Sequence, residues 1–155
     1  MTIKQMTHEA KAIASIVHSS FPEMEFFQEN DVPYLVMRSV TGTSLKDKIV
    51  HGEPMDEQKA IAYFQGIIEA LQELHKVKTE HHNIQPSQIM ITDDDRAILT
   101  GFVPAKQITP ASTSRGESTN AYIPYYNSKI DPKRGAQDVY AIRGNALLCC
   151  YQLTT

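Results

Sequence analysis

The segment from residue 56 to 78 has the clearest periodicity in this chain of 155 residues. Apolar residues recur there every three or four positions: Ala60, Phe64, Ile67, Leu71 and Leu74. This spacing places them on one face of a long α-helix. A helix in a globular protein is stabilised mainly by burying such a face. The chain is therefore expected to build a packed core around this segment.

Shorter patterns predict further elements on both sides of this helix. Strands are expected over 23–28 and 33–37, joined by the turn residues Asn30 and Asp31. A helix is expected over 8–17, with Thr7 as its N-cap and Ala10, Ile13 and Val17 on one face. The remaining expected elements are a short helix over 44–50, strands over 89–92 and 97–100, and a helix over 135–153. That last helix is apolar nearly all round and is expected to be buried.

Composition indicates one ordinary globular domain spanning 1–155. Hydrophobic residues make up 41% of the chain and charged residues 21%. A net charge of −3 gives no basic surface for nucleic acid. No apolar run is long enough to span a bilayer, and residues 1–12 do not form a secretory signal. The adjacent Cys149 and Cys150 are interpreted as buried thiols of a cytoplasmic protein.

The stretch HHNIQPSQIMI, residues 81–91, follows the long helix and leads into a strand. It resembles the catalytic loop of protein kinases, which runs His-Arg-Asp, a few residues, then Asn. Asn83 stands at the position of the catalytic Asp, and Gln88 at that of the magnesium-binding Asn. Gln85 replaces a Lys that is common in Ser/Thr kinases. Because an amide is neutral, Asn83 cannot act as a carboxylate base.

Other segments resemble kinase motifs in the same order. These are YLVMRSVTGTSL (34–45), LTGFVPAK (99–106), AYIPYY (121–126) and QDVYAI (137–142). The resemblance implies a truncated kinase-like fold of the α+β class. It would have a residual small lobe (1–38) of one helix and two strands. A mainly helical partial large lobe (39–155) would end at the central helix.

The departures from the kinase pattern concern catalysis. Gly101 replaces the metal-binding Asp of the Asp-Phe-Gly motif, and His82 replaces an Arg that contacts a phosphorylated loop. Glu9 matches the Glu of the small-lobe helix, but Lys4 is too close in sequence to be its strand partner. The Gly-rich loop has no counterpart. Either Tyr126 or Asn127 replaces the Glu that ends the activation segment.

The positions that shape the kinase interior are kept. The resemblance implies that His81, Phe102 and Ile13 stack in an internal hydrophobic spine, with Met24 as a fourth member. Asp138 matches the carboxylate that accepts hydrogen bonds from the catalytic-loop backbone. His75, His81 and His82 are either a zinc site or packed histidines, and Asp93–Asp95 are either a metal site or a hairpin turn. The packed and turn interpretations are favoured, with no metal and no cofactor.

These features predict a pseudokinase: not an enzyme, but a protein-binding or regulatory module. The alternatives are an atypical minimal kinase or other ATP-dependent phosphotransferase, with Glu9, Glu80 and His82 as candidate residues, and a fragment of a larger kinase-like protein. The expected partner is another protein or a second copy, bound through the incompletely covered central helix. Neither nucleic acid nor membrane is expected. The Ser/Thr-rich segment 107–120 suggests phosphorylation by another kinase.

Overall fold

A computed structural model describes residues 3–52, 55–102 and 136–152, with the side chains of 136–137 and 147–152 excepted. The elements in these ranges are α1 (Ile3–Ala14), β1 (Met24–Glu29), β2 (Val32–Met37), β3 (Thr43–Ser44), α2 (Leu45–Val50), α3 (Glu57–Lys76), η1 (Pro86–Gln88), β4 (Ile89–Ile91), β5 (Ala97–Leu99) and α4 (Ala136–Gln152). The α+β class that the sequence predicts is confirmed.

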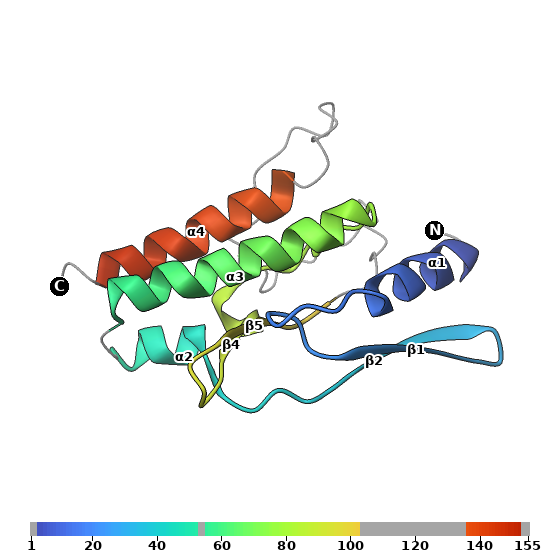
Figure 1. Ribbon diagram of the computed structural model, residues 1–155, viewed down its shortest axis with the longest axis horizontal. Coiled ribbons are helices and arrows are strands. Elements are labelled where there is room, and N and C mark those ends of the chain that lie inside the picture. Colours follow the sequence, from blue (N-terminus) through green and yellow to red (C-terminus); the bar gives the residue numbers. More distant parts are fainter. Residues whose placement is uncertain (1–2, 53–54, 103–135, 153–155) are drawn as a thin grey trace, which may run out of the picture.

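Strands β1 and β2 form an antiparallel hairpin, in which Met24 lies opposite Met37. Its two-residue turn holds Asn30 at φ 48° and Asp31 at φ 62°. Asn and Asp tolerate this left-handed backbone, which is the geometry of the common two-residue hairpin turn. Helix α1 packs on the hairpin through a face that includes the buried Ile13 (Figure 1).

A second, three-stranded sheet has the order β3-β4-β5, with both pairs antiparallel. Ser44 ends β3 and caps α2, because its Oγ accepts a hydrogen bond from the Asp47 amide at 3.1 Å. Strand β5 packs against α3, and α2 packs against β4. The start of β4 follows directly from the 81–88 loop, so this sheet fixes where that loop ends.

Helices α3 and α4 lie side by side (Figure 1). Asp56 caps α3 through its side chain, which accepts from the Gln58 amide at 3.0 Å. The predicted apolar face of α3 is buried, and Ile67 and Leu74 have no exposed surface. One hydrophobic cluster joins α3 to both sheets, to the end of α1 and to the first turns of α4.

Two expectations about the helices are wrong. Helix α1 begins at Ile3 and ends at Ala14, so Thr7 lies inside it and Val17, 95% exposed, lies beyond it. The chain leaves the helix early because Ile16 and Phe21 turn inward to join the core before β1. Helix α4 is not buried all round: among its described side chains, Val139 is 66% exposed, while Ala141 and Ile142 on another face are buried.

Several predictions lie outside the described residues. These are the Ser/Thr-rich segment 107–120, the AYIPYY segment and the side chains of Cys149 and Cys150. The division of the chain at residue 38 stays a prediction, and so does a cytoplasmic location. Among the helices that the structure describes, none has the length and apolar character needed to cross a membrane.

Candidate functional site

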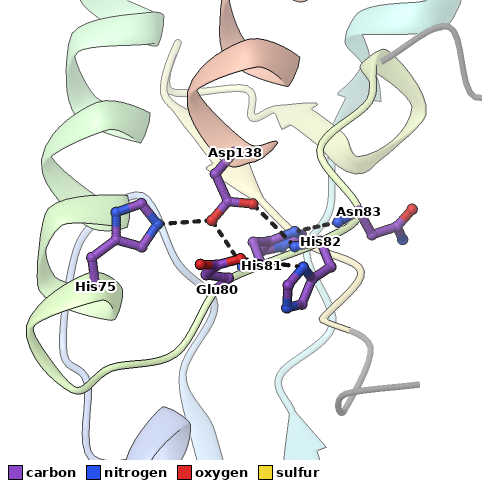
Figure 2. A network of polar contacts seen from close by, with 6 residues as sticks. All are labelled: His75, Glu80, His81, His82, Asn83 and Asp138. Carbon is purple, nitrogen blue, oxygen red and sulfur yellow. Dashed lines mark hydrogen bonds and ion pairs between the residues drawn. The ribbon is translucent and has the colours of Figure 1, made fainter. Parts of the chain in front are cut away.

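The loop at 81–88 is anchored to α4 by the carboxylate of Asp138. Its Oδ2 accepts the backbone N–H of His81 at 3.0 Å, and its Oδ1 accepts that of His82 at 3.1 Å (Figure 2). His75, near the end of α3, donates through Nε2 to Oδ2 at 2.8 Å. Asp138 is 1% exposed, so these donors compensate for the water it has lost. The predicted role of Asp138 as acceptor for the loop backbone is confirmed.

The backbone at His82 has φ 61°, in the left-handed region. This conformation is costly for a residue with a side chain. His82 is also one of the two residues whose backbone N–H groups donate to Asp138. The side chain of His82 lies 3.6 Å from Glu80, measured from Nδ1 to Oε2 (Figure 2).

His81 is fully buried and stacks on Phe102, with ring centroids 4.5 Å apart. Phe21 adds an edge contact to Phe102 at 4.9 Å, and the buried Ile13 and Met24 belong to the same cluster as Phe102. The rings of His81 and Phe102 are inclined at 55° and lie against each other, with Phe102 in this cluster. Burial lowers the pKa of His81 from 6.5 to about 4, although the Asp138 carboxylate acts in the opposite direction. At neutral pH His81 is an uncharged ring.

The hydrogen bonds of His81 define its tautomer. Its Nδ1 accepts the backbone N–H of Asn83 at 3.3 Å, so the proton is assigned to Nε2. Within the described part of the chain, Nε2 has no hydrogen-bond partner. His81 is therefore a packing residue in this structure, and its lone pair is occupied by the loop backbone.

Asn83, at the position of the catalytic base, is held by two neutral hydrogen bonds. Its Nδ2 donates to the carbonyl of Gly101 at 3.1 Å, and its Oδ1 accepts from Nε2 of Gln85 at 3.1 Å. A carboxamide oxygen has two lone pairs, so one remains on Oδ1 for a further donor. This atom can orient a hydroxyl group but cannot take its proton.

Gln88 and Gly101 meet where a kinase holds magnesium. An ideal Cβ atom on Gly101 would overlap Oε1 of Gln88 and lie 2.5 Å from its Cδ. Gly101 also has φ 77°, which disfavours most side chains. The Gln88 carboxamide thus takes the room of a side chain at position 101.

These two positions do not fit a magnesium ion. Magnesium is bound through one or two carboxylates in near-ideal octahedral geometry. Gln88 offers a neutral amide and Gly101 offers no side chain. In the described residues, no group of three or more His, Cys, Asp or Glu side chains is placed to hold a metal. Asp93–Asp95 form the turn between β4 and β5, where Asp95 adopts φ 61°.

Glu9 lies half-buried on α1 and takes no part in the network around Asp138. The structure brings together eight of the nine predicted site positions, all except Glu9, around the 81–88 loop and the end of β5. Sequence reasoning missed the contact of Phe21 with Phe102 and the hydrogen bond between His75 and Asp138. The Leu-His pair at the end of α3 was a signal for the second.

Comparison with known proteins identifies the fold and the family. Residues 1–142 match the model of the protein kinase domain. The chain belongs to the protein kinase family. Among its kinase relatives, a probable serine/threonine-protein kinase of Clostridium acetobutylicum is 30% identical over 137 residues, covering 86% of this chain and 21% of the relative. Serine/threonine-protein kinase PrkC of Bacillus subtilis is 24% identical over 146 residues, covering 90% of this chain and 22% of PrkC.

Solved structures agree on the kinase fold. The crystal structure of Rad53 residues 1–466 in complex with AMP-PNP aligns with a TM-score of 0.70 at 19% identity, over 94% of this chain and 37% of Rad53. This likeness shows the fold alone. The chain spans about a fifth of the length of the two curated relatives above.

The prediction that this kinase-family chain is a pseudokinase, and not an enzyme, is contradicted. Its relatives are named serine/threonine-protein kinases, which points to kinase activity. The prediction depended on the replacement of the catalytic base and of both magnesium ligands, at Asn83, Gln88 and Gly101, and on the absence of the strand Lys and the Gly-rich loop. Such losses alone do not establish inactivity.

Proposed function

We propose that the protein containing this chain transfers phosphate from a nucleoside triphosphate to Ser or Thr hydroxyls of proteins, as an atypical member of the kinase family. The observation that supports this is the anchored loop. Asp138 binds two successive backbone N–H groups, so Asn83 is presented from a fixed position. Phosphoryl transfer depends mainly on positioning and charge stabilisation, with little covalent chemistry for the protein.

The reaction has a defined balance. A bond forms between the substrate hydroxyl oxygen and the γ-phosphorus, while the bond from that phosphorus to the β–γ bridging oxygen breaks. The free Oδ1 lone pair of Asn83 accepts a hydrogen bond from the hydroxyl. The proton then leaves to a phosphate oxygen or to water, since the amide cannot hold it. A nucleoside diphosphate and a phosphorylated side chain are the products.

The rate is expected to be low. A general base contributes about 10²–10⁴-fold in rate, and typical kinases turn over at about 1–100 s⁻¹. Loss of the base alone therefore places this protein about 10²–10⁴-fold below that range. Gln88 and Gly101 offer no carboxylate, so these two positions supply no metal ligand to the reaction.

The test is transfer of labelled γ-phosphate to a library of Ser- and Thr-containing peptides. Wild type is compared with Asp138→Asn, which weakens the loop anchor, and with Glu25→Gln, an exposed change on β1. The proposal expects transfer by wild type and Glu25→Gln, and its loss in Asp138→Asn that is still folded by circular dichroism. Transfer that is equal in all three samples would indicate a contaminating kinase and count against the proposal.

We also propose that the chain binds a protein partner at a groove on α3. The groove has a volume of about 540 Å³ and is lined by Ile61, Phe64, Ile68 and Ala146, with Glu57 and Glu69 beside them. Ile61 is 53% exposed and Ile68 is 41% exposed. Apolar residues at these helical intervals suit an amphipathic helix laid along the groove.

Charge favours a basic partner over a second copy. Two copies joined about a twofold axis would bring the same carboxylates of Glu57 and Glu69 together. A helix with Lys or Arg beside its apolar stripe would instead complement them. The proposed occupant is therefore a basic amphipathic helix of another protein.

The probe for this groove is a synthetic amphipathic peptide with Leu at helical intervals and Lys beside them. Fluorescence anisotropy is expected to detect binding to wild type and to the control Val50→Lys, but not to Ile68→Lys. Equal binding to all three would contradict the assignment. So would a dimer, measured by light scattering, that Ile68→Lys dissociates, because the occupant would then be a second copy.

A further inference from the structure

Gly101 and the Gln88 side chain lie next to each other in the structure, although they belong to two different kinase motifs. Adding a Cβ atom to Gly101 would place it 3.0 Å from Cγ and 2.5 Å from Cδ of Gln88, with the amide oxygen closer still. Real Cβ atoms do not approach other heavy atoms at such distances, so a side chain at 101 requires Gln88 to move. A side chain at 101 and the Gln88 carboxamide in its present position therefore exclude one another.

The backbone of Gln88 is held by the neighbouring strand end. Thr100 donates its backbone N–H to the carbonyl of Gln88 at 2.8 Å and its Oγ1 to the same oxygen at 3.0 Å. Its Oγ1 also lies 3.4 Å from Oε1 of Gln88, within weak hydrogen-bond distance. The backbone N–H of Gln88 also donates to the carbonyl of Gln85 at 2.8 Å, within the turn that leads into β4.

Further amide contacts connect the 81–88 loop to the end of β5. Asn83 donates to the Gly101 carbonyl, and Gln85 donates to Asn83, both at 3.1 Å. The Asn83 carboxamide thus joins the loop directly to the end of β5 and is supported by Gln85, while the Gln88 carboxamide lies beside Thr100. None of these side chains carries charge, so the join requires no cation to offset repulsion between carboxylates.

We propose that Gln88 and Gly101 form an exclusive pair, in which the Gln88 carboxamide takes the place of a side chain at 101. Neutral amides, and not a divalent cation, then hold the 81–88 loop to the strand end. Gln88 is a positioning residue in this arrangement. Any metal used in catalysis is brought by the nucleotide phosphates and receives no side-chain ligand from positions 88 and 101.

The first test is a thermal double-mutant cycle on the full chain, without nucleotide. Gly52 supplies the control, because it has φ 65° and no atom within 4 Å of an added Cβ. Gly52→Ala is expected to lower Tm by about 2–8 °C, the effect of a left-handed alanine alone. Gly101→Ala is expected to lower Tm more than this. In a Gln88→Ala background, Gly101→Ala is expected to cost no more than Gly52→Ala does.

Equal Tm losses for Gly101→Ala and Gly52→Ala in wild-type Gln88 would overturn the exclusive pair. So would a Gly101→Ala loss that Gln88→Ala does not reduce. If Gly101→Ala does not fold while Gly101→Ala/Gln88→Ala does, the pair is supported, because removing the carboxamide restores the fold.

The second test uses manganese ion alone. Wild type and Gly101→Asp are expected to show no metal-dependent rise in Tm. Gln88→Asn/Gly101→Asp, which shortens the amide and adds a carboxylate, is expected to gain a rise of about 3–6 °C at a tenfold excess over Kd. A rise in wild type that Gln88→Ala abolishes, or no gain in a folded double variant, would contradict the proposal. Neither test measures phosphate transfer, so this inference and the proposed function can fail separately.

Discussion

Oδ2 of Asp138 accepts the backbone N–H of His81 at 3.0 Å, a bond between residues 57 positions apart in the chain. It joins the first turns of α4 to the loop that follows α3. The carboxylate is buried and the bonded atoms are backbone, so a change of side chain at 81 would leave the bond in place. The position of the loop therefore depends more on Asp138 than on the loop residues that differ from the kinase pattern.

Replacing Asp138 with Asn tests this anchor. One carboxylate oxygen becomes an NH₂ group facing donors, so we expect a loss of about 2–4 kcal/mol in the free energy of unfolding. Urea denaturation at pH 7 should show a lower midpoint with an unchanged m-value. The exposed control Glu25→Gln should stay within about 0.5 kcal/mol of wild type. An Asp138→Asn midpoint equal to wild type would show that the carboxylate does not hold the loop.

The buried His81 predicts a pH dependence of stability. Its pKa is about 4 in the folded chain and 6.5 without burial, so the unfolded state binds more protons between these values. The stabilisation is complete above pH 6.5 and is lost as the pH falls towards 4. His75 and His82 lie nearby, but His81 is the one with no exposed surface.

The check is Tm measured from pH 7.5 to 4.5 for wild type, His81→Gln and the exposed control His8→Gln. We expect a falling Tm in wild type and His8→Gln, and a shallower fall in His81→Gln. If the three slopes coincide, His81 is not the group that titrates.

Tyr63 connects α3 to the turn between β4 and β5. Its hydroxyl donates to Oδ1 of Asp95, whose other oxygen lies 2.6 Å from Nζ of Lys59. Burial raises the pKa of Tyr63, and the Asp95 carboxylate raises it further. Tyr63→Phe removes only the hydroxyl and is expected to cost about 1 kcal/mol.

The control for this change is Tyr34→Phe, since Tyr34 is 46% exposed and its ring contact with Phe27 is kept. Chemical denaturation should leave Tyr34→Phe within about 0.5 kcal/mol of wild type. Equal losses in both variants would mean that the bond to Asp95 adds nothing specific.

Local chemistry made much of the fold predictable. The apolar stripe of α3 is read directly from residue spacing, and Asn30 and Asp31 mark a turn because they tolerate left-handed backbone. The limits of α1 were missed in both directions: Ile3 and Met6 continue the spacing of Ala10 and Ile13 towards the start of the helix, while Val17 fits the same spacing but lies beyond its end. The exposure of Val139 was missed because apolarity alone does not say which face of a helix has a neighbour.

The candidate site was only partly predictable. Motif order placed Asp138 and His81 together, although no local pattern connects residues so distant in sequence. The clash between Gln88 and a side chain at 101 depends on backbone angles and on distances across the loop. The sequence shows that both metal ligands are replaced. It does not show that the Gln88 carboxamide occupies the space of a side chain at 101.

The most direct test of the account is the rate of phosphate transfer by wild type and by Asn83→Asp. Wild type should transfer slowly, and Asn83→Asp should be faster by about 10²–10⁴-fold, because the carboxylate can take the hydroxyl proton. The rate of Asp138→Asn, in which the loop anchor is weakened, is measured in the same assay for comparison. No transfer by either wild type or Asn83→Asp, with both proteins folded, would contradict the proposed activity.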